Sequence, residues 1–378
     1  MKILQITCHY LPNIGGVETH LNDLVTELSL RKNEVIVLTY QPLTTDVSDK
    51  VWETQNRFNK NKGSVTILRI PWIKGYFYSL VQFPILEFIY LSLPLFIVMP
   101  FMVLIYKPRI IHSHGLVAGF VGVFWGKIFH KRVIISTHSI YNFPQQGLYS
   151  AFVKWIFHNA NSVLCLSQQS KDEVISLGIP KEKVHVFNYW VNQALFHKIS
   201  NAKRELGVQD SFVVLFVGRL IKEKGIFPLL KAAKEWDSKI LLLLAGSGPL
   251  EKYVKKNQDE KRIRYVGRVR QEDLPLYYSA SDILIVPSIH EEGFGRVLLE
   301  SFFCGTPVIA AKRGGMLEAM NEEMGFFIKI TPKNIKRTLE YCYAHRLELE
   351  DKSNKAKSYA EKRYSKKNIE VIIKTYEG

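Results

Sequence analysis

The segment "MKILQITCHYLPNIGGVETHLNDLVTELSLRKNEVIVLTY", residues 1–40, decides the fold class. Its two ends, "KILQIT" (2–7) and "EVIVLTY" (34–40), are short apolar runs typical of buried strands. Between them, four apolar residues recur at the spacing of one helix face: Leu21, Leu24, Val25 and Leu28. A strand, a helix and a second strand in this order predict a βαβ unit with two parallel strands.

The same alternation continues along the chain. Four more strand-like runs follow in the first half, at residues 65–70, 109–114, 132–138 and 162–167. After a join near residues 184–196, five others lie at residues 212–218, 239–246, 262–267, 282–288 and 306–311. Helical patterns separate the runs, so we expect parallel sheets with helices on both faces. The sequence therefore predicts an α/β protein of two doubly wound domains, residues 1–190 and 191–354.

The composition narrows the class of protein and its partners. Hydrophobic residues make up 47% and charged residues 23% of the 378 residues, which is typical of a globular chain and not of a disordered one. The net charge of +16 suits nucleic acid, an anionic membrane surface or a phosphorylated small molecule, although a basic solvated surface is the simplest explanation. No zinc-ligand spacing or aromatic RNA-binding signature accompanies the charge, so we expect no nucleic acid partner.

The cysteines and the N-terminal residues bear on the compartment. The four cysteines are scattered and form no C-x-x-C pair: Cys8, Cys165, Cys304 and Cys342. This usage predicts a reduced, cytoplasmic compartment. The start of the chain turns polar at Gln5 and again at Thr7, so it lacks the apolar region of a signal peptide and predicts a strand instead.

One segment departs from the pattern of a soluble protein. Residues 88–106, "FIYLSLPLFIVMPFMVLIY", contain no charge over 19 positions, which meets the length of a membrane-spanning helix. Pro94 and Pro100 lie inside the run and Glu87 precedes it, which favours a buried or membrane-docked helical hairpin over a span. Whether the segment docks on, spans or avoids a membrane stays open. A docked segment predicts peripheral association with the cytosolic face.

Two strand-to-helix loops of the first half contain candidate ligand contacts. Ligands of open parallel sheets bind beyond the carboxyl ends of the strands, where helix N-termini point. The loop "HYLPNIGGVETHL" (9–21) contains Gly15 and Gly16, which let backbone N–H groups approach an anion, although a plain tight turn has the same pattern. His138 ends a predicted strand and suits a contact to a sugar hydroxyl or a proton transfer, although a structural histidine is the alternative. His112 and His114 are weaker candidates.

Two loops of the second half suit a nucleotide. "VGRLIKEKGI" (217–226) contains Arg219 just after a strand and Lys224 five residues later, and a guanidinium fork with an ammonium charge fits a diphosphate. Two exposed cations of a basic protein are the alternative. "LAGSGPL" (244–250) ends a strand in small residues, which leave room for a base or a ribose.

A further loop, "PSIHEEGFG" (287–295), precedes a helix and places Glu292 and Glu300 eight positions apart. Since eight residues of regular helix rotate roughly 80° beyond two turns, the two carboxylates do not form an acid and base pair on one face. They suit different parts of one ligand. Backbone N–H groups from Gly295 onward can bind the phosphate of that ligand. Glu300 can accept hydrogen bonds from a ribose diol, and Glu292 can accept them from a second polyol. A diphosphate between two hydroxylated rings is a nucleotide sugar.

Together these motifs resemble the retaining glycosyltransferases of family 4, which have the GT-B architecture of two Rossmann-like domains facing each other across a cleft. The matching segments are "PNIGGVETH", "VGRLIKEKG", the E-x7-E pair Glu292 and Glu300, "CGTPVIA" and "GGMLE" (314–318), in order from about residue 1 to residue 330. The start and "IIHSHG" are especially similar to the catalytic subunit that adds N-acetylglucosamine to phosphatidylinositol, and to bacterial and archaeal relatives.

The resemblance implies transfer of a hexosyl unit from a nucleotide-diphosphate sugar to an acceptor hydroxyl, with retention of configuration. The acceptor would be a lipid-linked or cell-surface glycan. The resemblance also implies that a C-terminal helix at about residues 355–378 packs back on the first domain. An epimerase or phosphorylase of the same fold is the alternative enzyme, and a nucleic-acid-binding protein is the alternative without catalysis. The donor base, UDP, GDP or ADP, and the sugar stay open.

The resemblance also assigns roles to individual residues. Glu292 and His138 would act at the reacting sugar, with His138 facing the sugar and the acceptor. Arg219 and Lys224 would contact the diphosphate, and Glu300 the ribose. Val297 would lie near the nucleoside, and Gly16 would contact the distal phosphate. The full set of implied donor contacts has eight residues: Gly16, Arg219, Lys224, Gly293, Phe294, Gly295, Val297 and Glu300.

Two features of the sequence qualify these roles. At the domain join the chain reads "FNYWVN", with Phe187, Tyr189 and Asn192 where relatives have Pro, Gly and Asp, so hinge geometry and acceptor choice are in doubt. The chain has no D-x-D motif that could clamp a metal on the diphosphate. We therefore expect no metal or other cofactor, because Arg219, Lys224 and helix N-termini can neutralise the leaving group.

Overall fold

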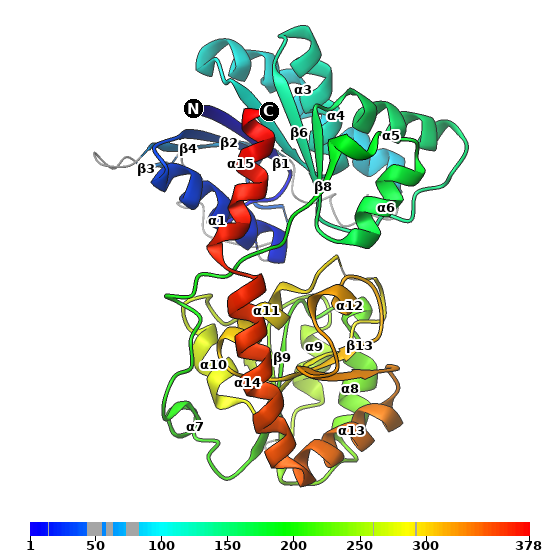
Figure 1. Cartoon of the computed structure of the whole chain (residues 1–378). Coiled ribbons are helices and arrows are strands. Elements are labelled where there is room, and N and C mark those ends of the chain that lie inside the picture. The colour runs from blue at the N-terminus through cyan, green and yellow to red at the C-terminus, as the bar shows by residue number, and fades with distance from the viewer. Residues whose placement is uncertain (14, 44–54, 58–62, 73–82, 260, 292) are drawn as a thin grey trace. The chain divides into compact units, whose positions relative to one another are not determined.

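The expected alternation of strands and helices forms two sheets, whose strands are parallel except for β3 (Gln55–Arg57) at one edge of the first. The computed structural model describes residues 1–13, 15–43, 55–57, 63–72, 83–259, 261–291 and 293–378. The chain divides into two compact units, the first made of Met1–Asn188 with Asn368–Gly378 and the second of Tyr189–Lys367 (Figure 1). The last residues of the chain thus belong to the same unit as the first.

The first unit contains an eight-stranded sheet, counted over the described residues, in the order β3-β4-β2-β1-β5-β6-β7-β8. Its strands are β1 (Lys2–Thr7), β2 (Glu34–Tyr40), β3 (Gln55–Arg57), β4 (Val65–Ile70), β5 (Ile110–His114), β6 (Arg132–Thr137), β7 (Ser162–Cys165) and β8 (Val184–Val186). Its helices are α1 (Gly16–Leu30), α3 (Pro84–Tyr106), α4 (Gly115–Ile128), α5 (Leu148–Asn159), α6 (Gln168–Ser176), η2 (Lys181–Lys183) and α15 (Ile369–Glu377). β3 runs antiparallel to β4, and the other neighbours are parallel.

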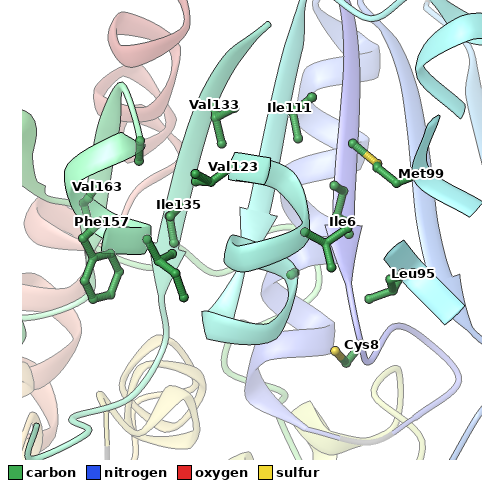
Figure 2. Packing of buried hydrophobic residues seen from close by; sticks show 14 of the residues in the cluster. Ile6, Cys8, Leu95, Met99, Ile111, Val123, Val133, Ile135, Phe157 and Val163 are labelled. Carbon is green, nitrogen blue, oxygen red and sulfur yellow. The ribbon is translucent and has the colours of Figure 1, made fainter. Parts of the chain in front are cut away.

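The pleat of the central strands sorts their side chains onto two faces. Leu4 and Ile6 of β1 and Ile111 of β5 belong to the apolar core that α3 and α4 cover (Figure 2). Because side chains alternate along a strand, Gln5 and His112 point to the opposite face. α15 covers that opposite face, where the Gln5 amide contacts Tyr376. One side of the sheet is therefore apolar, and the other carries buried polar groups.

α3 is one continuous helix of 23 residues, so the expected helical hairpin is wrong. Pro94 and Pro100 lie within it without ending it. Four residues at four-residue spacing are buried in the core: Leu91, Leu95, Met99 and Val103. Leu95 and Met99 reach toward Ile6 and Cys8 (Figure 2). Burial of this stripe, worth about 1.5–3 kcal/mol per side chain, holds the helix on the sheet.

The outer face of α3 is apolar too. A second stripe on the helix is about half exposed: Ile89, Leu93, Ile97 and Phe101. Over the described residues, α3 is the one helix long and apolar enough to cross a membrane, and a third of its apolar window is buried. The helix is thus a core element of the first unit that also presents an apolar surface.

The second unit contains a six-stranded parallel sheet, counted over the described residues, in the order β11-β10-β9-β12-β13-β14. Its strands are β9 (Phe212–Val217), β10 (Ile240–Ala245), β11 (Ile263–Gly267), β12 (Ile283–Val286), β13 (Val308–Ala311) and β14 (Gly325–Ile328). Its helices are α7 (Ala202–Glu205), η3 (Lys222–Lys224), α8 (Ile226–Ala233), α9 (Glu251–Lys256), α10 (Leu274–Ala280), α11 (Arg296–Phe303), α12 (Met316–Ala319), α13 (Pro332–Ala344) and α14 (Arg346–Arg363). The short helix η4 (Lys366–Asn368) connects this unit to α15.

α15 is fastened to the first unit by polar contacts as well as by packing. Arg31 and Glu370 form an exposed ion pair at 2.6 Å. The Arg132 side chain donates from Nε to the Thr375 carbonyl at 2.9 Å. Ile369, Ile372 and Tyr376 are buried. α14, by contrast, belongs to the second unit over its whole length, from Arg346 to Arg363.

Candidate functional site

The strand-to-helix loops of the second unit meet at one edge of its sheet. β9 lies between β10 and β12, and all three strands are parallel, so their carboxyl ends share that edge. The Leu220 N–H donates to the Ser247 carbonyl at 2.9 Å, which joins the loops after β9 and β10. The Ile289 N–H donates to the Glu223 carbonyl at 2.8 Å, which joins the loops after β9 and β12.

Two glycines permit close approach of backbone segments at this edge. A Cβ at Gly225 would lie 1.9 Å from the Pro287 carbonyl oxygen, and the residue has φ +72°. A Cβ at Gly315 would lie 1.9 Å from the Gly293 carbonyl oxygen. Since no side chain fits at either position, glycine is required for the loops after β9, β12 and β13 to pack together. The "GGMLE" segment thus supports the loop that precedes α11.

Glu300 is buried within the first turns of α11, where two side chains orient its carboxylate. Tyr278 of α10 donates its hydroxyl to Oε2 at 2.9 Å, and Arg296 donates from Nε to Oε1 at 3.0 Å. Arg296 also donates to the Trp190 carbonyl at 3.3 Å. Burial and the neighbouring carboxylate raise the pKa of Tyr278 well above its usual value, which keeps the phenol protonated as a donor. Neither Tyr278 nor Arg296 was among the predicted site residues.

The backbone before α11 is held in place by the Phe294 side chain. Phe294 is buried, and its ring lies 5.9 Å from that of Tyr189 and 5.5 Å from that of Tyr364. Gly295 caps the helix with φ +73°, and Val297 in the first turn is half-buried. The predicted role of Phe294 rests on its backbone, which this side-chain packing leaves available. Glu292, the predicted partner of Glu300, lies outside the described residues.

The two predicted cations occupy the loop after β9. Arg219 is exposed two residues beyond the end of the strand, and Lys224 is half-buried at the end of η3. Through Gly225 and Ile289 this loop lies against the loop after β12. The structure therefore brings the segments that carry Arg219, Lys224, Gly295 and Glu300 to one edge of one sheet.

The predicted residues of the first unit lie at the carboxyl ends of β1 and β6. Gly16 is exposed and is the first residue of α1, a helix of 15 residues. The N–H groups of the first helical turn and the positive end of the helix dipole lie there, and both can bind an anion. His138 directly follows β6 and is buried. Gly16 and His138 belong to the first unit, whereas the other described residues of the predicted site belong to the second.

His138 belongs to a buried hydrogen-bond chain. Its Nε2 lies 3.0 Å from Nδ1 of His114, and His114 Nε2 lies 2.7 Å from Oε1 of Gln5. The Gln5 amide nitrogen donates to the Tyr376 hydroxyl at 3.2 Å. The Tyr376 hydroxyl also contacts Nδ1 of His112 at 2.7 Å. Sequence reasoning ranked His112 and His114 low and missed Gln5 and Tyr376.

Burial keeps these histidines neutral. It lowers the pKa of His112 to about 3 and that of His138 to about 4, and it holds the pKa of His114 well below its usual value. Their mutual repulsion when charged adds to the effect on His112 and His114. At neutral pH each ring therefore has one N–H donor and one acceptor nitrogen.

The unusual Phe187 at the domain join lies beside His138. The Phe187 ring is buried and packs edge-on against His138, with 6.3 Å between ring centroids. It also lies 5.5 Å from the ring of His20 of α1. Phe187 therefore forms an aromatic wall beside His138.

The described residues contain no group of three or more His, Cys, Asp or Glu side chains arranged to hold a metal ion. The histidine chain is occupied by hydrogen bonds to glutamine and tyrosine instead. In the loops at this sheet edge, Arg219, Lys224 and the N-terminus of α11 offer positive charge.

Two family models match consecutive parts of the chain. The family model described as "Glycosyltransferase Family 4" matches residues 14–194. The model described as "Glycosyl transferases group 1" matches residues 198–363. The two matches follow each other along the chain and meet near the boundary between the two units.

Two curated relatives match most of the chain. An uncharacterised glycosyltransferase of Methanocaldococcus jannaschii is 30% identical over 362 residues, which cover 88% of this chain and 86% of the relative. One component of the phosphatidylinositol N-acetylglucosaminyltransferase of Homo sapiens is 24% identical over 359 residues, which cover 90% of this chain and 68% of that component.

Among solved structures, Anabaena HepE in complex with UDP and glucose is similar over its whole length. The TM-score is 0.76 at 22% identity, with 99% of each chain covered. This likeness confirms the predicted fold class of two Rossmann-like units, the GT-B fold.

The neutral histidine chain predicts that acid destabilises the first unit. The pKa values of His112 and His138 in the folded protein lie below the ordinary value of 6.5, so the unfolded chain binds protons first as the pH falls. Stability is fully present above pH 6.5 and is lost as the pH falls toward 4. We expect a loss of up to about 1.4 kcal/mol per pH unit for each histidine, measured by urea unfolding at pH 7.5 and 5.0.

His138→Gln should reduce the loss of unfolding free energy per pH unit. His197→Gln removes an exposed histidine of the second unit and should leave that loss unchanged. Equal unfolding free energies at the two pH values would contradict the prediction.

Proposed function

The chain belongs to the glycosyltransferases of family 4 and group 1, and from this premise we propose that it moves a hexosyl unit from a nucleotide-diphosphate sugar to an acceptor hydroxyl with retention of configuration. The observation that supports the proposal best is the convergence of the loops after β9, β10, β12 and β13. They gather two cations, a helix N-terminus and an oriented carboxylate at one sheet edge. These groups match a diphosphate and a ribose.

The proposed reaction breaks the bond between the anomeric carbon and the diphosphate oxygen, whose electron pair leaves with the nucleotide. The acceptor oxygen forms the new bond to the anomeric carbon, and its proton passes to the leaving phosphate oxygen. Arg219, Lys224 and the α11 N-terminus neutralise the charge that develops on the diphosphate. Retention follows if attack occurs on the face that the phosphate leaves, with Glu292 stabilising positive charge on the ring.

The remaining site residues take supporting roles. Glu300 accepts hydrogen bonds from the ribose diol, oriented by Tyr278 and Arg296. The backbone of Gly293, Phe294 and Gly295 contacts the transferred sugar. Val297 lies near the nucleoside, Gly16 offers N–H groups to the distal phosphate, and His138 contacts the sugar or the acceptor hydroxyl.

We propose a UDP-sugar as donor and a lipid-linked hydroxyl as acceptor. HepE of similar fold is described in complex with UDP and glucose. The human relative is named for transfer of N-acetylglucosamine to phosphatidylinositol. Both names describe those proteins, and they make these two substrate classes the first to test on this chain.

The apolar outer face of α3 supports peripheral association with an anionic membrane surface in the cytoplasm. Ring contacts between Phe88, Phe120 and Trp155 connect α3 to α4 and α5. Exposed basic residues lie just after α3 and on the two neighbouring helices: Lys107, Arg109, Lys127 and Lys154. Glu87 is the one acidic residue of α3, and burial raises its pKa. Apolar side chains bordered by cations fit acyl chains below anionic headgroups.

The activity is tested by incubating the protein with UDP-glucose or UDP-N-acetylglucosamine, with and without a membrane lipid extract. We expect a glycosylated lipid whose anomeric configuration, measured by NMR, is that of the donor. Release of free or isomerised sugar without acceptor would favour the phosphorylase or epimerase alternative. Retention on DNA without binding of any sugar nucleotide would favour the nucleic-acid alternative.

Lys224→Ala should weaken donor binding because it removes a charge-assisted contact to the diphosphate. We expect the dissociation constant of the donor, measured by calorimetry, to rise roughly tenfold or more, which is about 1.5–3 kcal/mol. Lys222→Ala is the matched control, since Lys222 is an exposed cation of the same short helix. Equal affinities of the two variants would exclude Lys224 from the donor site.

Transfer should not require a divalent metal, because protein cations and a helix N-terminus take the place of a metal clamp on the diphosphate. We expect an unchanged initial rate in excess EDTA. Loss of activity in chelator that manganese restores would show that a metal takes part.

The apolar stripe of α3 should bind vesicles. The double variant Leu93→Glu with Ile97→Glu should lower co-flotation with phosphatidylcholine and phosphatidylglycerol vesicles at least tenfold, because each buried side chain contributes about 1.5–3 kcal/mol. Leu347→Glu, at an apolar position 84% exposed on α14, is the control. Flotation that is unchanged in the double variant, or a dimer that the double variant abolishes, would assign the stripe to another partner.

A further inference from the structure

We propose that a cavity of the first unit, between the loop after β6 and helix α6, binds the hydroxylated ring of a membrane lipid that serves as the acceptor. The inference rests on the proposed function for the part that this lipid takes in transfer. The cavity itself, and the chemistry of its walls, belong to the first unit alone.

The cavity lies at the edge of the first sheet where ligands of parallel sheets bind. β6 and β7 are parallel neighbours, so the loop after β6 and the start of α6, which follows β7, share the carboxyl edge of the sheet. The volume of the cavity is about 300 Å³. Six residues line it: Ile140, Asn142, Phe143, Gln145, Gln169 and Glu173.

The loop that forms one wall is held in place by α6 and by the core. Glu173 of α6 accepts the backbone N–H of Tyr141 at 3.1 Å and that of Phe143 at 2.8 Å, one on each carboxylate oxygen. The Phe143 ring is buried and stacks on the Tyr141 ring at 4.9 Å. Asn142, between them, has φ +53°, a conformation that asparagine tolerates better than most residues. A wall fixed before binding reduces the entropy that is lost when a ligand binds.

The polar groups of the cavity suit hydroxyl groups. The amides of Asn142 and Gln145 each offer donors and an acceptor, and the Glu173 carboxylate accepts. Gln145 donates to the Ser176 hydroxyl at 3.3 Å, which orients its amide. Hydroxyl groups can bind to both kinds of partner, because each is a donor and an acceptor.

Other ligand classes fit the cavity less well. None of the six described lining residues is Lys or Arg, so the cavity has negative charge and does not favour a phosphate. Its one carboxylate already accepts two N–H groups, which is too few oxygen ligands for a metal ion. Ile140 and Phe143 add apolar surface for the C–H groups of a ring. The volume is at the lower end of the range for ligand pockets, roughly 300–1,000 Å³, and therefore fits one neutral polyol ring.

Apolar side chains adjoin the cavity at the start of α5. Leu148, the first residue of that helix, is 93% exposed, and Tyr149 is 51% exposed. Burial and the charge of Glu173 raise the pKa of Tyr149, so this side chain lies within range of the cavity. Phe152, one turn further along α5, packs edge-on against Phe88 of α3 at 5.4 Å between ring centroids. Apolar surface therefore continues from the polar cavity to the helix that we propose as the membrane contact.

This arrangement fits an amphiphile better than a free sugar. The ring would bind in the cavity, and the chain attached to it would lie along Leu148 and Tyr149. The loop of the cavity begins directly after His138. Arg219 and Lys224, the proposed diphosphate contacts, belong to the second unit, so acceptor and donor would use separate residues.

The test measures polyol binding to the full chain by saturation-transfer NMR, without any nucleotide sugar. Methyl β-glucoside and myo-inositol are the probes, and we expect the wild-type protein to saturate the ring protons of at least one of them. Gln145→Ala and Asn142→Gly should each raise the dissociation constant about three- to tenfold, because each removes one hydrogen-bonding amide. Glycine at position 142 retains the left-handed backbone.

Gln146→Ala is the matched control. Gln146 is the next residue of the same exposed loop and is not among the six that line the cavity, so this variant should bind the polyol as the wild type does. In transfer assays with a membrane lipid extract, Gln145→Ala should raise the KM of the acceptor by the same factor and leave the KM of the donor unchanged.

A second pair of probes distinguishes the head group of a lipid from a soluble sugar. The wild type should bind octyl β-glucoside more tightly than methyl β-glucoside. Leu148→Ser should remove most of that difference and leave the affinity for methyl β-glucoside unchanged. Equal affinities of the wild type for the two glucosides would overturn the assignment to a lipid.

The proposal is overturned if the wild type saturates neither polyol, or if the wild type, Gln145→Ala and Asn142→Gly have equal dissociation constants. Polyol binding that both variants weaken, in a protein that transfers no sugar, would refute the proposed function and support the polyol site. Transfer with an unchanged KM of the acceptor in both variants would refute the site and support the function. The two failures therefore give different results.

Discussion

The parallel direction of neighbouring strands is the constraint on which the site depends. It places every strand-to-helix loop of a unit at one edge of the sheet, together with the N-termini of the following helices. In the second unit the loops pack so closely that a side chain at Gly225 or Gly315 would overlap a carbonyl oxygen. Glu300 is then held by Tyr278 from the preceding helix and by Arg296 from its own. The binding groups are thus fixed by packed backbone and buried side chains.

Most strands of the two sheets could be predicted from the sequence, because strands that are buried on both faces are continuous apolar runs. The run at residues 2–7 coincides with β1, and that at 34–40 with β2. The short edge strands β3, β8 and β14 were missed. β3 has only three residues, β8 falls in the segment interpreted as the join, and β14 is brief and only partly buried. α3 was misjudged because two prolines argued for a break, whereas packing of Leu91, Leu95, Met99 and Val103 keeps the helix continuous.

The predictable site residues are those that follow a strand and carry a charge suited to a nucleotide sugar. Arg219, Lys224 and Glu300 follow strands, and the structure gathers their segments. Tyr278 and Arg296 were not found, because their role depends on a carboxylate that reaches them only after folding. Arg296 did leave a signal, since it precedes Glu300 by one helical turn. The link from Gln5 to Tyr376 spans 371 positions, and no local pattern predicts it.

The polar face of the first sheet explains why the last helix belongs to the first unit. Gln5, His112 and His114 lie on central strands and are buried, and an unpaired buried polar group costs about 1–3 kcal/mol. The hydroxyl of Tyr376 satisfies both the Gln5 nitrogen and His112 Nδ1. Without α15 these groups would face water or lack partners, so the helix is needed to complete the core. The same chain of hydrogen bonds reaches His138 through Gln5 and His114, so the packing of α15 and the placement of His138 depend on one set of contacts.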